Sequence, residues 1–210
     1  AYAYGLLACH AYQVRFAEAL ENPGPRIPLT TCSVRWKNAV ALGRRLLWLH
    51  TYAERFCDES LGMEDCVPRL PEIRWSRVVS TLPEKVSAIR YDAPKMELRI
   101  GDGCVCGVRP EVWTFSVSGM QVVKKWLGYR TARGAGRAAN SKNPLDRIRL
   151  TDWPDGWNEE LIELLNVLTL TVDMESDLND SLTHILEGPL IESQSLPQPT
   201  AAERSAPPSR

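Results

Sequence analysis

The stretch MELRIGDGCVCGV, residues 96–108, decides the predicted fold. Two short runs of strand-forming residues flank a glycine-rich turn, which is the pattern of a β-hairpin. The same glycines lack the GxGxxG spacing and the strand–helix context of a dinucleotide-binding loop. The stretch therefore favours two antiparallel strands over a phosphate-binding loop.

The residues around this hairpin continue the same pattern. RWSRVV (74–79) and SAIRYDA (87–93) are further short runs bounded by Pro and Gly, as in the strands of a small antiparallel sheet. PEVWTFSVSG (110–119) fits either another strand or the entrance to a helix. MQVVKKWLGYR (120–130) has apolar residues at helical spacing and predicts a helix.

Helical patterns occupy both ends of the chain. Residues 1–21 predict one or two helices, which end where prolines follow. A long amphipathic helix is expected from Ser33 to about Phe56, and another over 157–186, where Gly188 and a proline end it. The sequence thus predicts an α+β fold in which N- and C-terminal helices flank a small central, mostly antiparallel sheet.

Length and composition predict one domain over residues 1–190. The chain has 210 residues, of which 44% are hydrophobic, and core-forming residues continue to about Leu190. Residues 191–210 are rich in Pro, Ser and Ala and predict a disordered tail. No stretch approaches the roughly 18–20 apolar residues of a membrane span, and no signal peptide is evident, so a cytoplasmic location is expected. A helical pattern already present at residue 1 suggests a piece of a longer chain.

The cysteines favour reduced structural thiols over disulfides, because the chain is large and has no dense cysteine framework. Cys104-Val-Cys106 resembles half of a zinc site but lacks a second closely spaced pair, so no metal is predicted. The six cysteines are Cys9, Cys32, Cys57, Cys66, Cys104 and Cys106.

Catalytic motifs are not evident. The sequence contains no GxSxG, HExxH or phosphate-loop signature. The acids between Asp173 and Asp180 fit a solvated helix face, because they lack the glycine and the final glutamate of a calcium loop. An enzyme with an unrecognised site is therefore the weakest hypothesis.

Positive charge is concentrated in residues 121–150, called the basic segment below. It holds eight Lys or Arg and one acid, Asp146, whereas residues 151–210 hold twelve acids and two arginines. Such a segment either contacts the phosphates and bases of nucleic acid or balances the acidic C-terminal helix, and charge alone leaves both open. The candidate DNA-binding residues are Lys124, Lys125, Arg130, Arg133, Arg137, Asn140, Lys142, Arg147 and Arg149.

Three stretches resemble one family. YAYGLLACHAYQVRFAEALENPGPRIPL (2–29) resembles a segment that follows the adenine methyltransferase domain in type ISP restriction–modification enzymes. VWTFSVSGMQVVKKWLGYR (112–130) and NPLDRIRLTDWPDGWNEELIELLNVL (143–168) are similar to later parts of the same C-terminal region.

The resemblance implies a specificity, or target-recognition, domain that binds double-stranded DNA. A methyltransferase domain or subunit upstream would flip an adenine and methylate it with S-adenosylmethionine. This chain has no N-P-P-Y box, glycine-rich S-adenosylmethionine loop, Walker motif or nuclease signature, so it is expected to need no cofactor and to perform no chemistry. The parent would be a site-specific DNA adenine methyltransferase of a bacterial restriction–modification system. The alternative is a protein-interaction module that docks a methyltransferase or ATPase partner in phage defence.

The residues of the first family motif are expected to be structural. Tyr4, Tyr12 and Phe16, together with PRIPL (25–29), are predicted to pack against a preceding domain, and Gly5 is predicted to permit a close helix crossing. No base-reading residue transfers by motif match. With the resemblance, the basic segment is predicted to face DNA.

Overall fold

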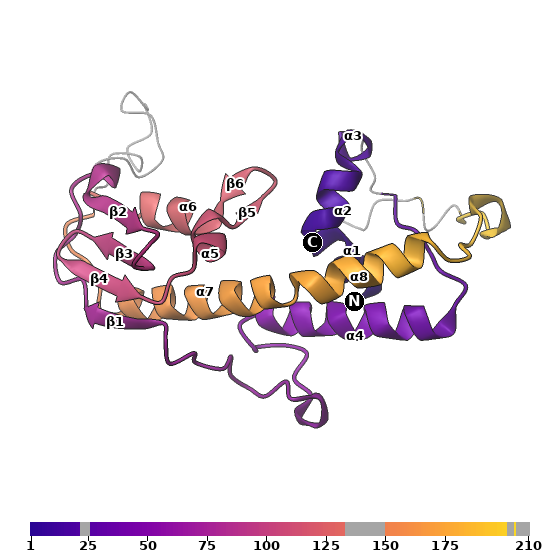
Figure 1. Cartoon of the computed structure of the whole chain (residues 1–210), viewed down its shortest axis with the longest axis horizontal. Helices are drawn as coiled ribbons and strands as arrows, with labels where there is room; N and C mark the ends of the chain where they lie inside the picture. Colours follow the sequence, from indigo (N-terminus) through magenta and orange to yellow (C-terminus); the bar gives the residue numbers. More distant parts are fainter. Residues whose placement is uncertain (22–25, 133–149, 201–203, 205–210) are drawn as a thin grey trace. The chain divides into compact units, whose positions relative to one another are not determined.

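The computed structural model describes residues 1–21, 26–132, 150–200 and 204. These residues form eight α-helices, a four-stranded antiparallel sheet and a two-stranded ribbon, with helices at both ends of the chain (Figure 1). The predicted α+β class and arrangement are confirmed. No helix in the described part of the chain is long and apolar enough to cross a membrane.

The chain packs as two compact units. Unit 1 comprises Ala1–Leu46 and Glu175–Arg210, and unit 2 comprises Leu47–Met174. The predicted domain 1–190 therefore takes in residues of both units. In the predicted tail 191–210, the described residues 191–200 are exposed and contain one 3₁₀ turn, η4 (Ser193–Ser195).

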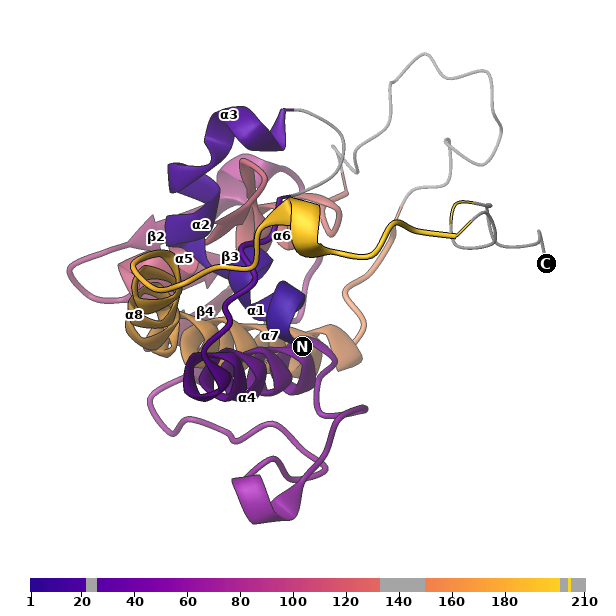
Figure 2. The ribbon, with the colours of Figure 1, turned by 90° about the vertical axis from the view of Figure 1, so that its right-hand side faces the viewer.

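Unit 1 is helical. Its elements are α1 (Tyr2–Ala8), α2 (His10–Arg15), α3 (Ala17–Leu20), the first turns of α4 (Ser33–His50), and α8 (Glu175–Leu186); Figure 2 looks along α4 and α8. The N-terminal pattern yields three short helices because Cys9 is extended (ψ 125°) and Phe16 leaves the helical region.

Glycines allow α1 and α4 to cross closely. A Cβ on Gly43 would lie 2.0 Å from the carbonyl oxygen of Ala1, and one on Gly5 would lie 3.0 Å from the Cα of Gly43. Side chains at these positions would separate the two helices. The predicted role of Gly5 in a close helix crossing is confirmed.

Two tyrosines of the first family motif, residues 2–29, form hydrogen bonds with the PRIPL stretch (25–29) at the end of that motif. The hydroxyl of Tyr2 donates to the carbonyl oxygen of Pro28 at 2.7 Å, and that of Tyr12 donates to the carbonyl oxygen of Arg26 at 2.5 Å. Tyr12 is 1% exposed and therefore packs inside its own unit and not against a preceding domain, which corrects the expectation for this residue. Tyr4 remains 36% exposed.

Unit 2 contains the sheet. Its strands are β1 (Arg74–Arg77), β2 (Ile89–Asp92), β3 (Glu97–Ile100) and β4 (Gly103–Cys106), in the order β1-β4-β3-β2 (Figure 1). β3 and β4 form the predicted hairpin, and Gly101 takes the left-handed φ of +57° that its turn requires.

The other elements of unit 2 are mostly helical. They are η1 (Glu59–Leu61), η2 (Val86–Ala88), α5 (Pro110–Thr114), the ribbon β5 (Ser116–Val117) with β6 (Met120–Gln121), α6 (Val122–Gly128) and α7 (Gly156–Asp173). Residues 110–119 thus contain both the helix and the strand that the sequence left as alternatives.

Two predicted helix boundaries are wrong. The single helix expected over 157–186 is two helices, because α7 ends at Asp173, Met174 forms its C-cap, and α8 begins at Glu175. The helix expected to reach Phe56 ends at His50, because Tyr52 and Ala53 take left-handed φ values of 54° and 61°. Such values are incompatible with continued α-helix.

One face of the sheet packs into the core of unit 2. Leu98, Ile100 and Val105 are fully buried and cluster with residues of α7, including Leu161 and Leu165. Successive side chains of a strand point to opposite faces of the sheet, so Glu97 and Arg99 of β3 lie on the outer face. The candidate site is on this outer face.

Candidate nucleic-acid interface

Arginines line the outer face of the four-stranded sheet. Arg77 of β1 pairs with Cys104 of β4, Cys104 pairs with Arg99 of β3, and Arg99 pairs with Arg90 of β2. Residues directly opposite each other in antiparallel strands share a face of the sheet. Arg77, Arg99 and Arg90, called the arginine row below, therefore cross the sheet side by side, and all three are exposed.

A bulge in β1 completes the arginine row. Trp75 pairs with Val105, so regular pairing would place Ser76 opposite Cys104. The register shifts between Trp75 and Arg77, which places Arg77 there instead. Trp75 remains on the inner face, where its indole N–H donates to the carbonyl oxygen of Asn158 at 3.1 Å.

The arginine row is electrostatically unfavourable by itself. Arg90 and Arg99 stand directly opposite each other, and like charges in such pairs destabilise a sheet. Arg99 is offset by Glu97, whose carboxylate lies 3.0 Å away. That hydrogen bond raises the pKa of the Arg99 guanidinium above its ordinary value. Arg90 has no ion pair with any described residue, and an anion above the row would relieve the repulsion.

A hollow lies at the β2–β3 end of the sheet. Its volume is about 410 Å³, and three cations line it: Arg90, Lys95 and Arg99. Asp92 also lines it and lies 3.5 Å from the ammonium of Lys95. Asp92 and Glu97 each offset one of these cations, so the hollow keeps a net charge of about +1, which Arg90 supplies and which favours an anionic group such as a phosphate.

Two predicted lysines lie on α6, which packs in the core on the inner side of the sheet. The ammonium of Lys124 lies 5.1 Å from the ring centroid of Trp113, and that of Lys125 lies 4.9 Å from the ring of Tyr129. Trp113 stacks on Tyr91 of β2 with 5.1 Å between ring centroids, so Lys124 lies beside the edge strand of the sheet. Both lysines are exposed, and neither forms an ion pair with a described acid.

Arg130 is held differently from the two lysines. Its guanidinium lies 3.6 Å above the ring centroid of Trp126 and 4.8 Å from that of Trp157, and it forms an ion pair with Glu160 at 3.0 Å. Only 21% of the side chain is exposed. These contacts fix the end of α6 to α7, so Arg130 anchors the basic segment more than it presents charge.

Comparison with known families identifies the chain. The sequence model of the type ISP C-terminal specificity domain matches residues 1–164. The chain belongs to this family. In restriction–modification, such a specificity domain serves target recognition. No curated protein and no solved structure matches the chain.

The match to the specificity domain spans all four strands of the sheet, α6 and the basic segment. Six of the predicted DNA-binding residues lie outside the described residues: Arg133, Arg137, Asn140, Lys142, Arg147 and Arg149. The described residues on either side are anchored together, since the rings of Trp126 and Trp153 lie 6.2 Å apart. The amide of Ala132 also donates to the carbonyl oxygen of Pro83 at 2.9 Å.

The arginine row was missed by sequence reasoning. Its members are separated by 13 and 9 residues in the chain, so no local charge count detects them. A signal existed in the alternation of Glu97-Leu98-Arg99-Ile100, which places charge on one face and apolar groups on the other. Pairing that strand with its neighbours was needed to bring the arginines together.

Proposed function

We propose that this specificity domain recognises a sequence in double-stranded DNA for an adenine methyltransferase of a restriction–modification system, acting in the bacterial cytoplasm in phage defence. The observation that supports this most is the arginine row. Its side chains are exposed on a rigid sheet, and neither Arg77 nor Arg90 forms an ion pair with a described acid. The family match supplies the context of target recognition.

The dimensions of the arginine row suit a DNA backbone. Strands lie about 4.8 Å apart, so the three steps from β1 to β2 span roughly 14 Å. This length corresponds to about four base-pair steps of 3.4 Å. Long arginine side chains would reach successive phosphates from such a row, and their planar guanidinium groups bind phosphate oxygens in pairs.

Phosphate contacts would position the domain, and base contacts would supply the specificity. We assign the phosphate contacts to the arginine row and to Lys124 and Lys125. We assign base reading to Arg133 and Arg137, which suit guanine, and Asn140, which suits adenine. The methyl transfer, and the S-adenosylmethionine that it needs, would belong to a partner methyltransferase domain or subunit, which would flip the adenine out of the stack.

Salt dependence of duplex binding tests the proposal. Each phosphate contact contributes about 0.9 to the slope of log affinity against log salt concentration. The variant R77A/R90A/R99A should therefore lose about 2.7 from that slope in a fluorescence-anisotropy titration with random duplex. The control R15A/R44A/R45A removes three exposed arginines of unit 1 and should keep the slope of the unchanged protein. Equal slopes for the arginine-row variant and the unchanged protein would overturn the assignment.

A further inference from the structure

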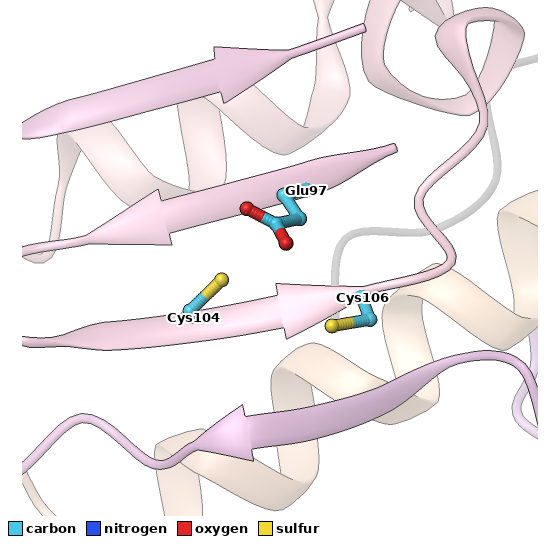
Figure 3. A group of neighbouring side chains, drawn as sticks. All are labelled: Glu97, Cys104 and Cys106. Carbon is cyan, nitrogen blue, oxygen red and sulfur yellow. The ribbon is translucent and has the colours of Figure 1, made fainter. Parts of the chain in front are cut away.

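Three metal-ligating side chains meet on the outer face of the sheet. Glu97 of β3 and Cys104 and Cys106 of β4 each offer one ligand atom, and these atoms all lie within 4.8 Å of one another. Figure 3 shows the three side chains on the same side of the two strands, with Glu97 projecting from β3 toward β4. All three are partly buried, and both cysteines are free thiols.

The strand register brings these residues together. Leu98 pairs with Val105 and Arg99 with Cys104, and the same antiparallel pairing places Glu97 opposite Cys106. Cys104 and Cys106 are two residues apart on one strand, so they share a face. The sequence offered one Cys-x-Cys pair and no second pair, and the neighbouring strand supplies the missing third ligand.

The geometry points to a binding site for a thiophilic divalent cation, with Zn²⁺ as the representative ion and one coordination position left for water. Two thiolates select Zn²⁺ over Mg²⁺ or Ca²⁺, which prefer oxygen ligands. Zinc–sulfur bonds of about 2.3 Å and zinc–oxygen bonds of about 2.0–2.2 Å put tetrahedral ligands roughly 3.5 Å apart. Shifts of about 1 Å in the side chains would therefore close the site.

The carboxylate is available to a metal. Only one oxygen of Glu97, Oε2, accepts the hydrogen bond from Arg99, at 3.0 Å. Oε1 accepts no hydrogen bond from the described residues and remains a ligand atom. Arg99 would then act as an outer partner that orients the carboxylate, an arrangement common around protein metal sites.

The surrounding charges favour an occupied site. Two thiolates and a carboxylate carry −3, so a divalent ion leaves −1. In the strand register, Arg74 of β1 stands opposite Cys106. Arg77 of β1 and Arg99 of β3 stand opposite Cys104, one on each side of β4. These guanidinium groups offset the remaining negative charge. The site also lies within the arginine row, yet its formation requires no DNA, so this inference is independent of the proposed function.

Cobalt substitution tests the site, because Co²⁺ bound by thiolates gives charge-transfer absorption in the near ultraviolet and intense visible bands when tetrahedral. Titration of the reduced, tag-free chain with Co²⁺ in the absence of DNA should give this spectrum with one ion per chain. Zn²⁺ should then abolish it. C104S/C106S should lose the charge-transfer bands. The matched control C57S/C66S removes two exposed cysteines outside the cluster and should keep them.

The glutamate is tested separately. E97Q leaves both thiols in place, and it should weaken Zn²⁺ binding at least about tenfold, since even the loss of an outer partner costs 10–100-fold. Circular dichroism of each variant would verify that the sheet has folded. Identical Co²⁺ spectra for the unchanged chain and C104S/C106S would overturn the inference. Loss of the signal in C57S/C66S alone would place the metal elsewhere and would overturn it equally, and neither result bears on DNA binding.

Discussion

The two basic regions of this molecule acquire their charge in different ways. The basic segment, residues 121–150, concentrates eight cations along a continuous stretch of chain. The arginine row takes one residue from each of three strands, and the pairing of the sheet places them side by side. A count along the sequence finds the first region, whereas the second exists only once the strands are in register.

The difference suggests a division of labour. The spacing of the arginine row is set by backbone hydrogen bonds between strands and cannot adapt to different base sequences. A fixed spacing suits the phosphate backbone, which is nearly the same in every duplex. Residues that read bases would instead have to differ among specificity domains that recognise different sequences.

The largest expected effect separates the two regions by what they recognise. R77A/R90A/R99A should weaken binding to selected and random duplexes alike, by roughly 10³-fold at low salt if each charged interaction contributes about 1.5 kcal/mol. R133A/R137A/K142A should instead reduce the preference for the selected sequence, by about 1–3 kcal/mol for each base-reading side chain that is removed. Competition binding with a duplex selected from a random pool measures both.

The same measurement can break the comparison. If both triple variants lower the affinity for selected and random duplexes by the same factor, the two regions do not divide phosphate binding from base reading. R15A/R44A/R45A serves again as the control, because it removes the same charge from unit 1.

Local signals explain which parts of the fold were predictable. The strands were predictable because Gly and Pro flank each short run of strand-forming residues. These two residues end a strand through their own backbone conformation, which the sequence displays directly. The break at Met174 was missed although the apolar stripe steps from Val172 to Leu178, a spacing of six residues that one continuous helix face does not have. The end of α4 was missed because the left-handed turn at Tyr52 and Ala53 contains neither Gly nor Pro.

The candidate site shows the same limit. Lys124 and Lys125 lie exposed on a helix, as a local pattern could predict. Arg130 differs from them through a local contact with Trp126 and through Trp157 and Glu160, which lie about thirty residues further along the chain. Interactions over this sequence separation depend on how α6 packs against α7, and the sequence does not display that packing.

The next effect in size tests whether Arg130 anchors the basic segment. Arg130→Met removes a guanidinium that contacts two tryptophans and Glu160, and it should lower the free energy of unfolding by about 1–2 kcal/mol. Lys125→Met, at an exposed position of α6, should change it by less than about 0.5 kcal/mol. Guanidinium chloride denaturation followed by tryptophan fluorescence measures both. Equal stability of the two variants would show that Arg130 belongs with the lysines.

The smallest effect concerns the like-charge pair within the arginine row. Arg90→Glu replaces repulsion with attraction toward Arg99, directly opposite on β3, and it should raise the free energy of unfolding by about 0.2–1 kcal/mol. The same change places a negative charge where a phosphate is proposed, so duplex affinity should fall further than in Arg90→Gln, which only removes the charge. If the repulsion between Arg90 and Arg99 lowers stability but serves DNA binding, Arg90→Glu should be more stable than the unchanged protein and should bind DNA more weakly. Arg90→Glu that is less stable than Arg90→Gln, or that binds duplex as tightly, would show that Arg90 and Arg99 do not act as a pair facing DNA.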